Sequence, residues 1–238
     1  MKSRILSLIF LSCFLVPVYA QHVTYRSSKH YNEMLDKFER LPRLDSTAIV
    51  MLGNSLTENG KDWNNKIEGA RHLVNRGIIG DDAIRIYHRL NQICSGHPKA
   101  IFFECGINDL SHGLSASKVA SDVERTIEAI RQQSPGTRLY VQSLLPINED
   151  FGRWKSLSGM TDVVPVINHL LQDYCSKNDI TFINLFDLMK YPENNKMRVE
   201  LCADGLHLTS KGYEVWAKAI APYVLELEDV TSLESTER

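Results

Sequence analysis

The sequence lacks the closely spaced residue pairs that usually bind a metal ion. No two cysteines are separated by two residues, and no two histidines are separated by three. Structural and catalytic zinc sites are generally assembled from such Cys and His ligands. We therefore expect no metal site.

The chain also lacks a basic cluster. Its 27 Lys and Arg residues stand against 29 Asp and Glu residues, and without Lys2 and Arg4 of the leader the net charge is −4 (25 − 29). Proteins that follow a nucleic-acid backbone need clustered positive charge to neutralise its phosphates. We expect no nucleic-acid partner.

No apolar run is long enough for a comfortable membrane span. The longest one, residues 5–18, is interrupted by Ser7, Ser12 and Pro17. A membrane-spanning helix needs about 20 predominantly apolar residues. The sequence therefore predicts no integral membrane span.

The same run instead has the features of a secretory signal peptide. Lys2 and Arg4 precede it, and residues 18–20 form a cleavage site before Gln21. We expect a signal peptide over residues 1–20, export to the periplasm or the cell exterior, and one domain over residues 21–238. Residues 10–13 loosely resemble a lipoprotein box, but the residues after Cys13 stay apolar, so lipid anchoring is the less favoured interpretation.

Outside the leader there are four cysteines: Cys94, Cys105, Cys175 and Cys202. An oxidising compartment permits disulfides, but four cysteines allow three pairings and the sequence favours none of them.

The length and pattern of the chain predict one α/β domain. At 238 residues with 43% hydrophobic content, it is long enough for a sizeable core. Apolar, strand-like runs alternate with stretches of helical spacing, and this alternation predicts a parallel, doubly wound sheet. The expected strands cover residues 48–52, 72–75, 100–105, 139–144 and 180–185. The expected helices cover residues 28–40, 82–93, 118–133 and 163–177, with a last helix beginning near Thr209 or Ser210 and a fraying polar tail over residues 230–238.

The residues of a nucleophilic hydrolase are present. Ser55 directly follows the first expected strand, and Asp204 and His207 lie together before the last helix. A serine hydroxyl needs an imidazole to take its proton and a carboxylate to orient that imidazole. Ser55, His207 and Asp204 are therefore our candidate catalytic residues.

Two further segments, residues 75–81 and 106–109, also follow expected strands. The carboxyl ends of parallel strands meet at one edge of the sheet, which is where ligands collect in open α/β folds. We expect these loops to converge on Ser55 and to supply donors to an oxyanion.

Each residue also has a plainer interpretation. Ser55 alone suits a helix N-cap, and residues 108–109 suit an ordinary turn. Gly80 could merely satisfy a positive φ, and Asp81 could merely favour the first turn of a helix. Apart from His112, which directly follows residues 106–109, the remaining histidines suit surface or packing positions. Only the combination of all these residues in order favours chemistry.

Together the motifs resemble those of the SGNH, or GDSL-type, hydrolases, in their platelet-activating-factor-acetylhydrolase-like and lysophospholipase-like branch. The resemblance covers nearly the whole mature chain and rests on residues 53–56, 80–81, 106–109 and 204–207. It implies a flavodoxin-like, three-layer α/β/α fold with a five-stranded parallel sheet, and ester hydrolysis without metal or cofactor.

The resemblance also implies residue roles. Ser55 would be the nucleophile, His207 the general base and then acid, and Asp204 its orienting partner. The backbone N–H groups of Ser55 and Gly80 and the side-chain amide of Asn108 would form the oxyanion hole. Asn54 departs from the family, which usually has Asp before the nucleophile. An amide can largely imitate the supporting hydrogen bonds of that Asp, so we expect activity to survive.

Substrate contacts are expected around this centre. We assign them to Asn54, Asp81, Asp109, His112 and Trp154. Trp154 lies in a long loop, residues 146–161, that follows the fourth expected strand and suits a wall over the substrate. The alternative is that Trp154 packs on the domain.

The sequence thus predicts an exported serine esterase that removes a small acyl group from a carbohydrate, with acetyl as the favoured acyl group. A lysophospholipase or thioesterase acting on longer acyl chains is the alternative enzyme. A glycan-binding module that has lost catalysis is the alternative of another class. The sequence does not indicate the oligomeric state.

Overall fold

The computed structural model of the chain describes residues 28–236, with side chains to residue 229. The predicted signal peptide, its cleavage site and Cys13 lie outside the described residues. Within residues 28–236 no helix is both long and apolar enough to cross a membrane.

Five parallel strands form the central sheet in the order β2-β1-β3-β4-β5. The chain therefore starts inside the sheet, adds one edge strand, and then crosses back to add the others, which is the flavodoxin-like order. This confirms the predicted five-stranded parallel α/β fold. The strands are β1 Ile49–Gly53, β2 Leu73–Gly77, β3 Ala100–Phe103, β4 Arg138–Gln142 and β5 Thr181–Ile183.

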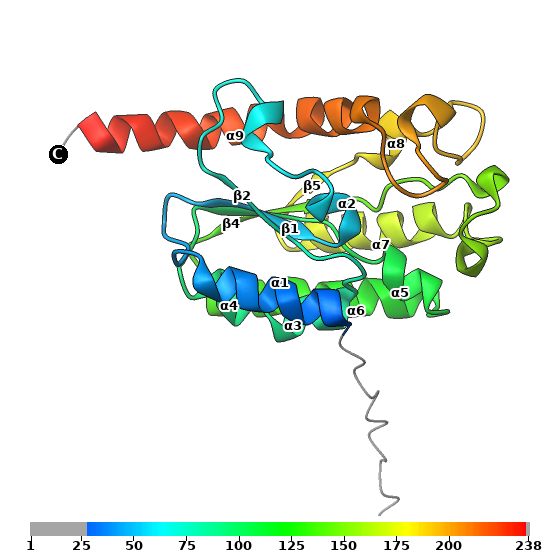
Figure 1. Ribbon diagram of the computed structural model, residues 1–238, viewed down its shortest axis with the longest axis horizontal. Helices are drawn as coiled ribbons and strands as arrows, with labels where there is room; N and C mark the ends of the chain where they lie inside the picture. Colours follow the sequence, from blue (N-terminus) through cyan, green and yellow to red (C-terminus); the bar gives the residue numbers. More distant parts are fainter. Residues whose placement is uncertain (1–27, 237–238) are drawn as a thin grey trace, which may run out of the picture.

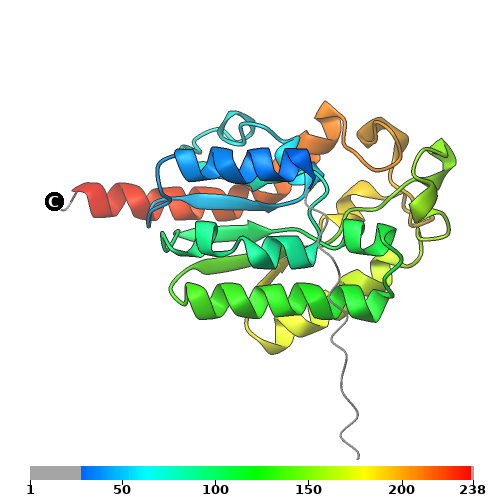
Figure 2. The same cartoon turned by 60° about the horizontal axis from the view of Figure 1, so that its bottom comes forward.

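Helices cover both faces of the sheet and complete three layers (Figure 1). The long helix α9, Ser210–Thr236, crosses one face, near α8, Phe186–Met189, and the short 3-10 helix η1, Asn64–Lys66. Figure 2 brings the opposite layer forward. That layer contains α1 Lys29–Arg40, α3 Ala83–His88, α4 Asn91–Cys94, α6 Ala116–Gln133 and α7 Val164–Lys177.

The middle of the sheet is the core. Every residue of β1 and β3 is buried, as expected for central strands covered by helices on both faces. On the α9 side, Trp216 packs edge-on against Trp63 with ring centroids 5.2 Å apart, and its indole N–H donates to Gln142 at 2.6 Å. This contact anchors α9 to the sheet.

Two expected elements differ from the structure. The helix predicted over residues 82–93 is two short helices, α3 and α4, because the chain turns at Arg89, whose side chain is directed inward to Asp81. The polar tail predicted to fray from residue 230 continues α9 to Thr236, since no Gly or Pro interrupts it there.

The four described cysteines are all buried and free, so no disulfide joins them. Burial raises the pKa of Cys94 to about 11 and that of Cys175 to about 12. These thiols pack as small hydrophobic side chains.

The loops after the first three strands leave the sheet at one edge. The short helix α2, Ser55–Glu58, follows β1, Gly80 follows β2, and α5, Ile107–Ser111, follows β3. Figure 1 shows α2 and α5 at the same end of the molecule.

Candidate active site

Ser55 begins helix α2 immediately after β1. Gly53 permits this tight turn, because a Cβ atom there would come within 2.3 Å of Thr57 Oγ1 and 2.7 Å of the Glu104 carbonyl oxygen. The N-cap is Asn54, whose Oδ1 accepts from the Leu56 N–H at 2.8 Å. Ser55 is thus not the cap, and its hydroxyl is available for other contacts.

The Ser55 hydroxyl contacts His207. The Ser55 Oγ–His207 Nε2 distance is 3.1 Å, and His207 Nδ1 lies 2.9 Å from Asp204 Oδ2. The structure therefore brings the three predicted catalytic residues into one hydrogen-bonded series. With a proton on Nδ1, the imidazole can accept the serine proton at Nε2.

Asp204 is held as a carboxylate. Its Oδ1 accepts from the backbone N–H groups of Leu206 at 3.1 Å and His207 at 2.8 Å. Partial burial alone would raise the pKa of Asp204, but hydrogen bonds from the His207 ring and from these N–H groups lower it to about 2. The Asp204 charge is thus available to orient the imidazole across the neutral range.

A glycine shapes the loop that carries Asp204 and His207. Gly205 has a φ of +95°, and a Cβ atom there would lie 2.6 Å from the Asn148 carbonyl oxygen. The Asn148 N–H in turn donates to the Gly205 carbonyl at 2.8 Å. The loop after β4 therefore supports the loop before α9.

The oxyanion candidates Gly80 and Asn108 lie on two adjoining segments, the loop after β2 and the start of α5. Asn108 Nδ2 donates to the Asp81 carbonyl at 2.7 Å, which ties α5 to the glycine loop. Gly80 has a φ of +82°, a conformation that favours glycine. Ser55 is the first residue of its helix, so the helix itself does not use its N–H. The assignment of the Ser55 and Gly80 N–H groups and the Asn108 amide to an oxyanion hole stays a prediction.

Glu58, which nothing in the sequence singles out, holds the glycine loop. Its carboxylate accepts from the Ile79 N–H at 2.5 Å and lies 3.0 Å from His30 Nε2 on α1. Glu58 occupies the last position of the helix that begins with Ser55. The nucleophile helix, the glycine loop and α1 are thereby linked.

Nor does the sequence single out Glu104, a fully buried carboxyl group next to the nucleophile turn. Asn54 Nδ2 donates to Glu104 Oε2 at 3.2 Å, while Oε1 has no hydrogen-bond partner in the described residues. Burial raises the pKa of Glu104 to about 8. The hydrogen bond from Asn54 lowers this pKa, and the nearby charge of Asp109 raises it. Glu104 is thus a neutral acid at neutral pH, and Asn54 donates to it. An Asp at position 54 would place a second carboxyl group in this buried site.

Three of the residues expected to contact substrate are buried in the protein. Asn54 caps α2, and Asp81 forms an ion pair with Arg89 at 2.8 Å, with both side chains almost inaccessible. Asp109 accepts from the Ala83 N–H at 3.1 Å, and burial raises its pKa to about 7. Their side chains hold the loops together, so our expectation that they bind substrate is corrected.

The other two expected residues, His112 and Trp154, are not buried. The His112 side chain is 54% exposed, and its Nδ1 is 3.7 Å from Asp82 Oδ2. Trp154 packs against the core and is also edge-on to His207, with ring centroids 5.2 Å apart. Trp154 therefore packs on the domain and stands beside His207, while its contact with substrate stays a prediction.

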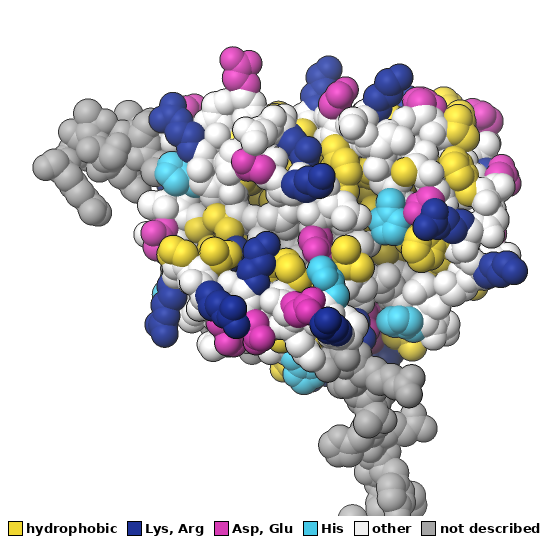
Figure 3. All heavy atoms as spheres, in the orientation of Figure 1, with side chains coloured by type: hydrophobic (Ala, Val, Ile, Leu, Met, Phe, Trp, Pro, Cys, Tyr) yellow, Lys and Arg dark blue, Asp and Glu magenta, His cyan; other side chains and the backbone are white. Residues whose placement is uncertain are grey.

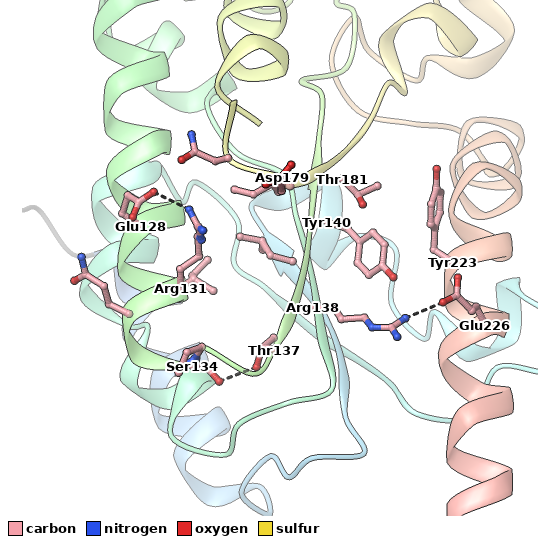
Figure 4. Close-up of a pocket in the computed structure, with 16 residues that line it drawn as sticks. Glu128, Arg131, Ser134, Thr137, Arg138, Tyr140, Asp179, Thr181, Tyr223 and Glu226 are labelled. Carbon is pink, nitrogen blue, oxygen red and sulfur yellow. Dashed lines mark hydrogen bonds and ion pairs between the residues drawn. The ribbon is translucent and has the colours of Figure 1, made fainter. Parts of the chain in front are cut away.

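A separate hollow of about 770 Å³ lies at the opposite ends of β4 and β5 (Figure 4). Its polar groups largely satisfy each other. Arg138 pairs with Glu226 at 2.8 Å, and Arg131 pairs with Glu128 at 3.3 Å. It has no link to the Ser55 site, and we assign it no ester chemistry.

Charged side chains of both signs are interspersed over the face shown in Figure 3, which has no broad patch of one sign. Within residues 28–236 no three His, Cys, Asp or Glu side chains gather into a group able to hold a metal ion.

Comparisons with known proteins agree with this architecture. A family model described as the GDSL-like Lipase/Acylhydrolase family matches residues 45–215, which include the Ser55, Gly80, Asn108 and 204–207 segments. No curated protein matches the chain significantly.

Solved structures share the fold at low sequence identity. A GDSL-like lipase from Bacteroides thetaiotaomicron aligns with a TM-score of 0.70 at 18% identity, over 82% of this chain and 97% of its own. A lipase/acylhydrolase from Enterococcus faecalis gives 0.56 at 21% identity, over 75% and 95%. The acetyl xylan esterase AlAXEase gives 0.57 at 20% identity, over 74% and 99%.

Proposed function

Because the chain belongs to the GDSL-like lipase/acylhydrolase family, we propose that it is a serine esterase. It would remove a small acyl group from a carbohydrate, with acetyl as the favoured acyl group. The observation that carries the proposal is the Ser55–His207–Asp204 series, with its 3.1 and 2.9 Å contacts. The family is one of serine carboxylic-ester hydrolases that use such a series.

The proposed reaction proceeds through an acyl-enzyme. Ser55 Oγ attacks the ester carbonyl carbon while His207 Nε2 takes the hydroxyl proton. The resulting oxyanion accepts hydrogen bonds from the N–H groups of Ser55 and Gly80 and from the Asn108 amide. When the carbonyl re-forms, the ester bond breaks and His207 returns the proton to the leaving alcohol. Water, activated by His207, then hydrolyses the acyl-serine.

Two observations support the carbohydrate acetyl ester. AlAXEase, one of the structures with this fold, is an acetyl xylan esterase. The aromatic ring of Trp154 stands beside His207 and suits the face of a sugar. Export of the enzyme is part of the proposal and rests on the leader pattern of residues 1–20.

The longer-acyl alternative also has a specific observation in its favour. Ile79, on the glycine loop, is 43% exposed, and Phe151, on the loop after β4, is 42% exposed. Such apolar side chains on site loops could cover a longer acyl chain. The non-catalytic glycan-binding alternative is less economical, because it leaves the assembled triad without a use.

Hydrolysis of p-nitrophenyl esters from acetyl to long-chain acyl decides between the two enzymes. We expect the highest kcat/KM with the acetyl ester, and no activity in Ser55→Ala. A maximum with long acyl chains would favour the lysophospholipase or thioesterase alternative. Serine-independent or absent hydrolysis of every ester would contradict the proposal.

A further inference from the structure

Arg153 stands beside Asp204 as an exposed cation in a long ion pair. Its side chain is 68% exposed, and its guanidinium carbon lies 5.9 Å from the centroid of the Trp154 ring. Its Nε is 3.9 Å from Asp204 Oδ2, which is beyond hydrogen-bond length. Within the described residues the guanidinium makes no hydrogen bond.

The triad does not need Arg153 for its own geometry. Asp204 already accepts hydrogen bonds from the His207 ring and from the backbone N–H groups of Leu206 and His207. The exposed guanidinium, which forms only a long ion pair with Asp204 in the described residues, can therefore bind another anion. A planar, five-donor group of this kind matches a carboxylate, sulfate or phosphate with two parallel hydrogen bonds.

The position of Arg153 indicates which part of the ester it meets. In serine hydrolases the histidine returns a proton to the leaving group, so the alcohol part of an ester lies on the histidine side. Trp154 contacts His207 on this side, and Arg153 lies over Trp154. The oxyanion donors come from other loops, those of Ser55, Gly80 and Asn108. Arg153 is therefore next to the alcohol part of the bound ester.

We propose that Arg153 binds an anionic group on the alcohol part of the substrate, so that the enzyme prefers acyl esters of acidic alcohols. A sugar carrying a carboxylate, sulfate or phosphate has the required chemistry. This inference rests on the proposed esterase function and specifies the charge on the alcohol part of the substrate. It makes Arg153 a specificity-determining residue.

The test compares two acetyl esters that differ in charge. 4-Acetoxybenzoate carries a carboxylate on its alcohol part, and methyl 4-acetoxybenzoate is its neutral counterpart. The measured quantity is the ratio of their kcat/KM values, anionic over neutral. Differences in leaving-group reactivity cancel when this ratio is compared between enzyme variants. 4-Acetoxyphenyl sulfate and 4-acetoxyphenyl phosphate, used in the same way, distinguish sulfate and phosphate from carboxylate.

We expect Arg153→Gln to lower the ratio about tenfold, mainly through KM of the anionic ester, as for the loss of a charged hydrogen-bonding partner. Arg153→Lys keeps the positive charge but loses the two parallel N–H donors of the guanidinium, so it should lower the ratio less. The matched control is Arg138→Gln, which removes an exposed arginine at the opposite end of the sheet and should leave the ratio unchanged. Raising the salt from about 0.05 to about 0.5 M should lower the wild-type ratio, because exposed charges are screened.

Two results would overturn this assignment. Unchanged kcat/KM values for both esters in Arg153→Gln would mean that the side chain binds no substrate anion. An equal loss with both esters would mean that Arg153 acts through Asp204 or Trp154 and not on the substrate charge. In both cases Ser55-dependent hydrolysis of the neutral ester would leave the esterase proposal standing. If neither acetyl ester were hydrolysed in a Ser55-dependent manner, the esterase proposal would fail and this inference with it.

Discussion

Asn108 is the proposed side-chain donor of the oxyanion hole. Its amide, in the first turn of α5, donates to the Asp81 carbonyl of the glycine loop at 2.7 Å. One preorganised oxyanion donor typically contributes about 10²- to 10³-fold to kcat. We expect Asn108→Ala to lower kcat by this order, with a smaller change in KM. Steady-state kinetics on p-nitrophenyl acetate measure both, and an unchanged kcat would remove Asn108 from the oxyanion hole.

Glu104 gives the fold a pH-dependent cost in stability. Burial raises its pKa from an ordinary 4.5 to about 8. For an acid with a raised folded-state pKa, stability is fully present below the unfolded pKa and is lost as pH rises through the folded pKa. The carboxyl group therefore makes unfolding easier at about pH 8 than at about pH 5.

We expect Glu104→Gln to remove this loss, because the amide oxygen can still accept from Asn54 without a charge. The variant should gain a few degrees in Tm relative to wild type at about pH 8, and less at about pH 5. Asp109, whose pKa is also raised by burial, stays in both proteins, so the difference between them isolates Glu104. Equal Tm differences at the two pH values would contradict a buried, titrating Glu104.

At the scale of elements, Glu58 joins the nucleophile helix α2 to the glycine loop. Loss of its bond to the Ile79 N–H frees the residue that precedes Gly80. We expect Glu58→Ala to lower kcat about tenfold while KM changes less, because small displacements of catalytic groups are costly. Glu33→Ala, on the exposed surface of α1, is the control. A kcat within twofold of wild type would show that the loop holds its position without Glu58.

The sequence predicted the elements better than the contacts between them. All five strands and the α/β alternation were recognisable because central parallel strands are continuous apolar runs. The split between α3 and α4 was not, since it depends on Arg89 reaching Asp81 within the fold. Glu58 and Glu104 were missed for the same reason. Their partners, Ile79 and Asn54, are distant in sequence and become neighbours only when β1, β2 and β3 align.

Substrate contacts were the least predictable part of the site. Residues within the recognisable motifs were assigned to substrate, yet Asp81 and Asp109 are buried and hold loops. The signal that could have warned of this is the apolar context of both segments. Arg153 and Trp154, in contrast, lie in a loop whose length and aromatic content indicated a wall.

Across the whole molecule, the candidate catalytic residues and the large hollow lie at opposite ends of the sheet. All loops that carry the triad and the oxyanion candidates leave the sheet at the carboxyl ends of its strands, as in other open α/β folds. The large hollow lies at the other ends of β4 and β5 and contains paired charges. The size of this hollow would favour it as the ligand site. We place the substrate at Ser55 instead, because the hydrogen-bonded Ser55 and His207 lie there.

The Ser55–His207–Asp204 series should make Ser55 an activated nucleophile, and covalent labelling by a fluorophosphonate measures that activation. Intact-protein mass spectrometry should show one adduct on the wild type and none on Ser55→Ala, with labelling slowed in His207→Ala because the base is absent. Ser115→Ala, which changes the N-cap serine of α6, is the matched control and should label like wild type. A wild type that does not label, or a Ser55→Ala variant that labels equally fast, would contradict the account.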